Sequence, residues 1–193
     1  MGEFLMGKAL VEQTWVKGID SKGRPIRVPG LDPTSKGTLV CPQCAGGTNW
    51  MAPSYSPLTH LFYFNVREGC DVFFSKPPVY KEGTSYWATS FRAEASQHQG
   101  GRVTAMDPLT GETKWKFPLY SSPWAGTLVT SGNLVFAGDE DGYLMALQAD
   151  TGKLLWRVNT GNRLVTSPIA FELDRKQYVT MPSGGVVLTF ALP

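Results

Sequence analysis

The chain has 193 residues, the size of one ordinary domain or of a large piece of one, so a multi-domain assembly is not expected. Its 21 glycines and 14 prolines, with 12% aromatic and only 18% charged residues, argue against helical bundles and coiled coils and favour strands joined by tight turns. The formal net charge of +2 comes from 18 basic and 16 acidic residues and indicates neither a nucleic-acid nor an anionic-membrane partner.

Residues 1–11 mix apolar side chains with Glu3, Gly7 and Lys8, a pattern typical of neither a membrane-spanning helix nor a signal sequence. No run of about 18 consecutive apolar residues occurs anywhere in the sequence. No transmembrane segment is therefore expected.

The three cysteines, at positions 41, 44 and 70, are odd in number and leave the redox compartment open. Cys41 and Cys44 form a CxxC pair, but the residues after it start no helix, as a thioredoxin-type site would require. A structural zinc site would need a second Cys/His pair at short spacing, and a c-type haem would need a histidine where the chain has Ala45. None of these three sites is predicted.

The most informative feature is an internal repeat. Residues 105–115 read AMDPLTGETKW and residues 146–156 read ALQADTGKLLW, which places Trp115 and Trp156 41 residues apart. Each copy predicts a strand, a turn whose glycine can adopt positive φ, and a strand that carries the tryptophan. Around the second copy, four apolar runs are separated by turn residues, which indicates one blade of a β-propeller. These runs are 127–130, 134–137, 143–147 and 154–158.

We therefore expect an all-β chain that folds as a partial β-propeller of about three blades. An N-terminal piece (1–46) precedes a blade at 47–118 with a long insertion at 67–99, followed by a second blade (119–160) and a three-strand final blade (161–193). An insertion of this length is usually functional or caps one face of a fold. Since closed propellers need about four to eight blades, we expect the chain to belong to a longer polypeptide or to pair its open strand edges with another chain.

Several conspicuous residues have structural explanations. Trp115 and Trp156 recur at equivalent positions and are predicted to pack between neighbouring blades. Asp107 corresponds to Gln148 in the other copy, which excludes a shared catalytic role and favours hydrogen bonding within a turn. The acidic run at 139–141 could offer carboxylates to Ca²⁺, but it falls where the repeat predicts an exposed hairpin turn, and a solvated turn is the preferred interpretation.

The pattern AxDxxTGxxxW resembles the blade motif of the pyrroloquinoline quinone (PQQ) dehydrogenases, which are eight-bladed propellers of the methanol and ethanol dehydrogenase type. Residues 41–57, CPQCAGGTNWMAPSYSP, are similar to the cofactor-contacting loop of that family with its GGxNW core. Residues 122–143, which begin SPWAGTLVT, resemble a late blade, and the ending at 184–193 resembles the closing blade. The similarity extends from about Trp15 to Pro193.

The resemblance implies a cofactor site. In the family, the Asn of GGxNW hydrogen-bonds PQQ beside the indole that follows, so Asn49 and Trp50 are the expected cofactor contacts. Trp124, at the matching entry of the next blade, is expected to line the same chamber. These residue types suit PQQ, a planar ortho-quinone with three carboxylates that needs amide or indole donors and flat apolar walls. Without the resemblance, Asn49 would be interpreted as a turn residue and Trp50 as a core aromatic.

The resemblance also implies what the chain lacks. The family oxidises alcohols by hydride transfer to PQQ, with an Asp as general base and a Ca²⁺ or lanthanide ion held partly by Glu and Asn. The corresponding motifs belong to earlier blades and have no match here, so we predict no catalytic residue and no metal ligand in this chain. It would oxidise alcohols only when the missing blades complete the pocket, with an electron acceptor such as a cytochrome c in the parent enzyme.

The alternative is a cofactor-free propeller that binds a protein partner, similar in its repeat to the lipoprotein that helps to assemble outer-membrane β-barrels. Such a scaffold has no reason to keep an amide and an indole together at the axial end of a strand. The GGTNW segment therefore favours the enzyme lineage, although the residues present do not identify the alcohol.

Finally, the resemblance implies a disulfide. In the similar dehydrogenases, a cysteine eight residues before the cofactor Asn is bonded to one a few tens of residues downstream, positions that Cys41 and Cys70 occupy here, with Cys44 left over. Such a bridge is worth about 3 kcal/mol in the chain-entropy model. It would hold the GGTNW loop against the hairpin at 61–66 and imply an oxidising compartment, the periplasm. The alternative is three reduced thiols in a cytosolic chain.

Overall fold

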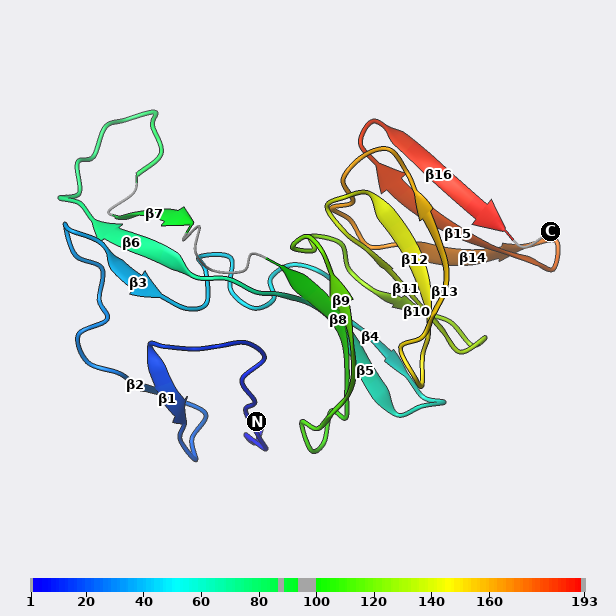
Figure 1. The fold of residues 1–193 in the computed structure, drawn as a ribbon, viewed down its shortest axis with the longest axis horizontal. Coiled ribbons are helices and arrows are strands. Elements are labelled where there is room, and N and C mark those ends of the chain that lie inside the picture. Colours follow the sequence, from blue (N-terminus) through cyan, green and yellow to red (C-terminus); the bar gives the residue numbers. More distant parts are fainter. Residues whose placement is uncertain (1, 87–88, 94–99, 192–193) are drawn as a thin grey trace. The chain divides into compact units, whose positions relative to one another are not determined.

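The computed structural model describes residues 2–86, 89–93 and 100–191, which leaves parts of the predicted insertion and the last two residues of the predicted final blade outside the described residues. Within these ranges the regular secondary structure consists of 16 β-strands and no helix, which confirms the predicted all-β class (Figure 1). Contacts divide the chain into two units, Met1–Gly47 with Glu68–Gln99, and Thr48–Arg67 with Gly100–Pro193.

The first unit combines the N-terminal residues with the insertion. A hairpin is formed by β1 (Val16–Ile19) and β2 (Pro25–Arg27), and an antiparallel sheet has the order β3 (Thr38–Val40), β6 (Asp71–Ser75), β7 (Thr89–Ala93). The sequence predicted the insertion but not the pairing of its strands with the N-terminal piece. This pairing has no signature in the local sequence, because each strand is a short apolar run and no tight turn links β3 to β6.

The second unit contains three antiparallel sheets in succession along the chain. The first has the order β4-β5-β8-β9, the second β10-β11-β12-β13 and the third β14-β15-β16. Their strands are β4 (Ser54–Ser56), β5 (Leu61–Arg67), β8 (Gly101–Met106), β9 (Thr113–Leu119), β10 (Leu128–Val129), β11 (Leu134–Gly138), β12 (Tyr143–Gln148), β13 (Leu154–Asn159), β14 (Ile169–Leu173), β15 (Lys176–Ser183) and β16 (Val186–Ala191).

The repeat is visible in the strand register. Ala105 pairs with Trp115 across β8 and β9, and Ala146 pairs with Trp156 across β12 and β13. In both sheets the register shifts immediately after the alanine, so a β-bulge recurs at the same point of the repeat. The two four-stranded sheets are therefore copies of one architecture, and the fold is the partial propeller that the sequence predicted.

The middle sheet is buried on both faces, and Figure 1 shows it between the other two. On one face, Val135 and Leu147 pack with Tyr63 of the first sheet. On the other face, Leu144 packs with Met181 of the third sheet. Because successive side chains of a strand point to opposite faces, a strand buried on both faces is apolar along its length. This explains why β11 and β12 are continuous apolar runs rather than alternating ones.

The repeat tryptophans pack between neighbouring sheets, as predicted. The indole Nε1 of Trp115 donates to the carbonyl of Ala149 at 2.8 Å. Gly152 has a φ of +72°, and a Cβ at that position would lie 2.6 Å from the Trp115 ring, so the turn and the indole both require glycine. Trp156, at the equivalent position, packs edge-on against Phe190 of β16 with ring centroids 5.4 Å apart.

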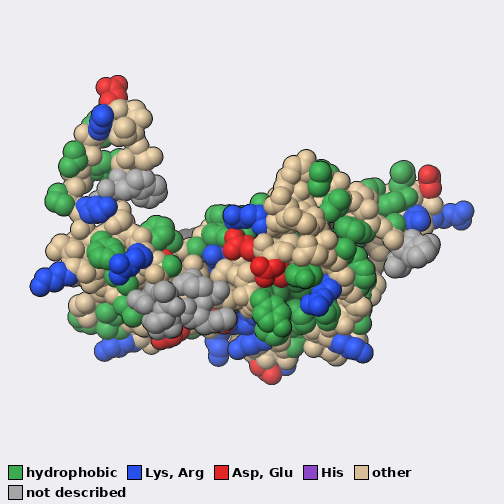
Figure 2. All heavy atoms as spheres, turned by 45° about the horizontal axis from the view of Figure 1, so that its top comes forward, with side chains coloured by type: hydrophobic (Ala, Val, Ile, Leu, Met, Phe, Trp, Pro, Cys, Tyr) green, Lys and Arg blue, Asp and Glu red, His purple; other side chains and the backbone are tan. Residues whose placement is uncertain are grey.

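The surface carries side chains of mixed kinds. On the face drawn in Figure 2, basic and acidic side chains are interspersed with hydrophobic ones. Surface ion pairs such as Lys114 with Glu112 are solvent-exposed and contribute little to stability. In the described part of the chain, no helix is long and apolar enough to cross a membrane.

Candidate functional site

Two of the residues assigned to a cofactor site lie together in the second unit. Trp50 precedes β4, and Trp124 lies in the loop between β9 and β10. Their rings are stacked, with centroids 4.4 Å apart and planes inclined by 14°. Trp50 is 64% exposed, whereas Trp124 is half-buried. The pair therefore presents a flat aromatic surface that a planar ligand can cover.

Arg67, the last residue of β5, completes the stack. It is only 5% exposed, and its guanidinium carbon lies 3.6 Å from the centroid of the Trp124 ring. Its Nη1 donates to the carbonyl of Pro123 at 2.9 Å. Two indole planes this close leave no space for a guanidinium between them, so Arg67 and Trp50 cover opposite faces of Trp124. We refer to Arg67, Trp124 and Trp50 as the stacked triad.

Sequence analysis did not identify Arg67. The available signal was an arginine that ends a mostly apolar strand, LFYFNVR, because buried strands rarely carry a charge. Its contact with Trp124 joins residues 57 positions apart and has no counterpart in the repeat.

The backbone on both sides of Trp124 is held against β5 and β8. The side-chain amide of Asn65 donates to the carbonyl of Ala125 at 2.6 Å. Gly101 approaches Pro123 so closely that a Cβ would collide with the proline ring. Trp124 therefore stands on a fixed loop, which gives the stacked triad a rigid support.

Asn49 is exposed in the loop that leads into Trp50 and belongs to the same unit. An exposed amide beside an exposed indole is the arrangement that the resemblance implies for a residue that donates to PQQ. The assignment of Asn49, Trp50 and Trp124 to cofactor binding stays a prediction.

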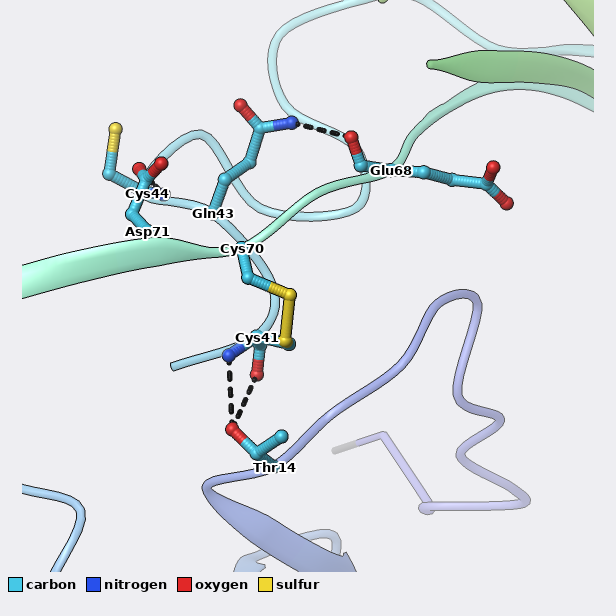
Figure 3. Close-up of a disulfide and its surroundings, with 7 residues drawn as sticks. All are labelled: Thr14, Cys41, Gln43, Cys44, Glu68, Cys70 and Asp71. Atoms are coloured by element: carbon cyan, nitrogen blue, oxygen red, sulfur yellow. Dashed lines mark hydrogen bonds between the residues drawn. A yellow bond between two sulfur atoms is a disulfide. The ribbon is translucent and has the colours of Figure 1, made fainter. Parts of the chain in front are cut away.

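The first unit contains the Cys41–Cys70 disulfide, the pairing that the resemblance implied (Figure 3). The two Cα atoms are 4.3 Å apart, and both residues are buried. The bridge joins the residue after β3 to the residue before β6, and Thr14 Oγ1 accepts the N–H of Cys41 at 3.0 Å. The hairpin at 61–66 belongs to the other unit, so the expectation that the bridge holds the GGTNW loop against it stays a prediction.

Cys44 lies outside the disulfide and is exposed. Its N–H donates to Asp71 Oδ2 at 2.8 Å. The side-chain amide of Gln43 donates to the carbonyl of Glu68 at 3.1 Å (Figure 3). These bonds fasten the CPQC segment to the start of β6. The Glu12 carboxylate and the two bridged sulfurs lie within 4.8 Å of one another, but sulfurs in a disulfide offer no thiolate to a metal.

Removing the disulfide should loosen the first unit. Replacing Cys41 with Ser is expected to cost about 3 kcal/mol and to lower the hydrogen-exchange protection of β3 and β6 by roughly 100-fold, because the unfolded segment gains chain entropy. Exchange followed by mass spectrometry under oxidising conditions measures this. The Cys44→Ser variant is the matched control and should change protection less than about threefold. Equal protection in both variants would contradict a stabilising bridge.

Asp107 behaves as predicted for a turn residue. Its Oδ1 accepts the N–H groups of Leu109 and Thr110 at 2.8 and 3.1 Å. These two hydrogen bonds hold the pKa of the Asp107 carboxyl below its ordinary value.

The structure corrects the prediction for the acidic run at 139–141. It was expected to be a solvated turn, but Asp139 is only 4% exposed. Its Oδ1 accepts the N–H of Tyr143 at 2.9 Å, and its carbonyl accepts the N–H of Leu164 at 3.1 Å. The prediction was wrong for Asp139 because the turn packs against the connection between β13 and β14, a contact that a single repeat does not reveal. Glu140 lies at the surface and pairs with Arg163.

The burial of Asp139 predicts a pH dependence of stability. Desolvation raises the pKa of this carboxyl above its ordinary value of 3.8, opposed by the hydrogen bond from Tyr143. The folded state therefore binds the proton of Asp139 more tightly than the unfolded state does. The resulting stabilisation is fully present below the pKa that Asp139 has in the unfolded state, and it is lost as the pH rises through the pKa that Asp139 has in the folded state. Asp139→Asn, which keeps the acceptor and removes the charge, should raise the free energy of unfolding at neutral pH and leave it unchanged in acid.

Urea denaturation at the two pH values measures this difference, with the exposed neighbour in Asp141→Asn as control. An equal effect of Asp139→Asn at both pH values would show that desolvation of the charge is not its cause.

A family model described as outer membrane protein assembly factor BamB matches residues 99–190 of the chain. The matched stretch contains the blade repeat and lies outside the CPQC and GGTNW segments. This match therefore rests on the repeat.

Curated relatives are quinoprotein alcohol dehydrogenases. The chain is 35% identical over 95% of its length to quinoprotein alcohol dehydrogenase PedH, and 39% identical over 90% of its length to PedE, both of Pseudomonas putida. It is 34% identical over 95% of its length to a quinohemoprotein alcohol dehydrogenase of Comamonas testosteroni. The chain covers 32%, 30% and 27% of these three proteins, so it spans about a third of their length.

Solved structures agree with these relatives. The chain matches europium-containing methanol dehydrogenase with a TM-score of 0.84 at 29% identity, over 92% of this chain and 32% of that one. It matches quinohemoprotein alcohol dehydrogenase from Comamonas testosteroni with a TM-score of 0.84 at 30% identity, over 94% of this chain and 29% of that one. In sequence and in fold, the chain belongs to the quinoprotein alcohol dehydrogenase family.

Proposed function

We propose that the chain contributes one side of a PQQ-binding chamber, with Asn49, Trp50 and Trp124 as cofactor contacts. In this proposal, alcohols are oxidised only when further blades complete the chamber. The observation that carries it is the stacked pair of indoles, which come from residues 74 positions apart and of which Trp124 lies on a fixed loop. A scaffold propeller needs no such flat, exposed aromatic surface.

The residues present suit PQQ. Its planar ring system matches the exposed face of Trp50, and its oxygens match the amide donor of Asn49. Bound PQQ supplies a two-electron acceptor for hydride, and the role of this chain is to bind and orient it.

The other requirements of the reaction lie outside the chain in this proposal. The general base and the ligands of a Ca²⁺ or lanthanide ion come from the missing blades. Among the described residues, the third sheet has three strands where the other two have four, and β16 is an edge strand without a second partner. An open edge of this kind supports completion by further strands, from the same polypeptide or from another chain.

The disulfide and the relatives support the cellular setting that we propose. The Cys41–Cys70 bridge supports an oxidising compartment, the periplasm. Relatives named quinohemoproteins support a haem-containing electron acceptor, such as a cytochrome c.

The competing function is a cofactor-free scaffold that binds a protein partner, which the description of the matching family model favours. The two functions differ in whether the chain binds PQQ.

Equilibrium dialysis of the chain against PQQ tests the proposal. We expect saturable binding by the wild type and at least about tenfold weaker binding by Trp50→Leu, which removes the stacking surface. Tyr120→Leu is the matched control, because Tyr120 is an exposed aromatic residue outside the stacked triad, in the connection between β9 and β10, and this variant should bind PQQ as the wild type does. Absence of saturable binding by the wild type would contradict the proposed function and favour the scaffold.

A further inference from the structure

Arg67 is a buried cation in the second unit that the cofactor contacts do not include. Burying a guanidinium is costly unless it is compensated by hydrogen bonds or charge. Here Nη1 donates to the carbonyl of Pro123, and the guanidinium plane lies on Trp124. The main chain of Arg67 is fixed as well, because it pairs with Gly101 in the sheet.

The contact with Trp124 differs from the other arginine–aromatic contacts of the described residues. Arg92 lies 5.8 Å from the Phe74 ring and Arg157 lies 5.1 Å from the Tyr143 ring, and both arginines are exposed. Arg67 is closer, at 3.6 Å, and buried. A cation over an aromatic face interacts more strongly when water is excluded, so this contact is the strongest of the three.

Arg67 holds Trp124 at two points, the carbonyl that precedes it and the face of its ring. Fixing both the backbone and the ring plane leaves the indole one orientation. Trp50 stacks on the opposite face at an inclination of 14°, so the orientation of the second indole depends on that of the first. Arg67 thereby influences the orientation of Trp50, the exposed end of the stack, without itself touching a ligand that binds there.

We propose that Arg67 is the positioning residue of the stacked triad and that its charge makes the site selective for planar anions over neutral planar rings. This inference rests on the proposed function and adds a residue and a selectivity to it. A charge in a buried setting is poorly screened by water and salt, so the anionic carboxylates of a ligand at the stack experience it.

The experiment compares Arg67→Met, which removes the charge and the donors, with Arg67→Lys, which keeps the charge. Arg157→Met is the matched control, since it removes an arginine–aromatic contact within the middle sheet, between β12 and β13, that involves no residue of the stacked triad. Two quantities are measured: the circular dichroism couplet of the stacked indoles, and the dissociation constants for PQQ and for phenanthrenequinone, a neutral planar ortho-quinone.

For Arg67→Met we expect a reduced couplet and weaker binding of both quinones, with PQQ weakened by about tenfold more than phenanthrenequinone, because loss of positioning affects both ligands and loss of the charge affects only the anionic one. Arg67→Lys should reduce the couplet yet keep the preference for PQQ. Arg157→Met should match the wild type in every measurement.

The inference is overturned if Arg67→Met keeps the couplet and the preference for PQQ, or if it loses affinity for both quinones equally. Should Arg67→Met fail to fold, Arg67→Lys decides: an unchanged couplet overturns the positioning role. A wild type that binds neither quinone contradicts the proposed function and the selectivity, whereas the couplets of the two variants still decide whether Arg67 positions the indoles.

Discussion

The 193-residue chain, supplied with PQQ and Ca²⁺, should show no alcohol oxidation above a cofactor-only blank. The reason is chemical, because the general base and the metal ligands of the resembling family belong to motifs that this sequence does not contain. Loss of such groups lowers a rate by several orders of magnitude, on the order of 10³ or more in total. A dye-linked assay with ethanol measures the rate, with a full-length relative such as the quinoprotein ethanol dehydrogenase of Pseudomonas aeruginosa as the positive control.

PQQ-dependent turnover well above the blank would contradict this expectation and place a base within the chain. Asp139 would be the first residue to test, since it is a buried carboxyl with a raised pKa in the unit that carries the stacked triad. Turnover that survived Asp139→Asn would exclude it.

The repeat made the fold of the second unit predictable. Thr-Gly turns and tryptophans at equal spacing specify hairpins, and the four strands of the middle sheet lie within one residue of their predicted bounds. The sheet of the first unit could not be predicted in this way. Its strands β3 and β6 come from separate segments, and their pairing is decided by tertiary contacts and by the disulfide rather than by a local pattern.

The candidate site was likewise predictable from the sequence only in part. Trp50 and Trp124 could be named from motifs, because each lies in a segment that resembles the dehydrogenases. Their stacking, the burial of Asp139 and the contact of Arg67 with Trp124 arise only when residues distant in sequence meet. An arginine at the end of a strand is ordinarily a solvated residue, so its position under an indole had no sequence signal strong enough to predict it.

Replacing Tyr63 with Ala should destabilise the second unit by about 3–5 kcal/mol, the usual cost of removing a fully buried aromatic side chain. Tyr63 has no exposed surface and packs in the core between the first two sheets, with its ring 5.8 Å from that of Trp115. Its hydroxyl donates to the carbonyl of Ala149 at 3.0 Å and bonds with Thr59 Oγ1. The substitution therefore leaves a cavity at the contact where one repeat packs on the next.

Tyr63→Phe separates packing from hydrogen bonding, because it keeps the ring and removes only the hydroxyl. It should cost about 1 kcal/mol, since the carbonyl of Ala149 still accepts the indole N–H of Trp115. Tyr55→Ala, at an exposed position of β4, is the control and should change the free energy of unfolding by less than about 0.5 kcal/mol. Urea denaturation followed by circular dichroism measures all three variants. If Phe cost as much as Ala, the hydroxyl network rather than the buried ring would hold the two sheets together.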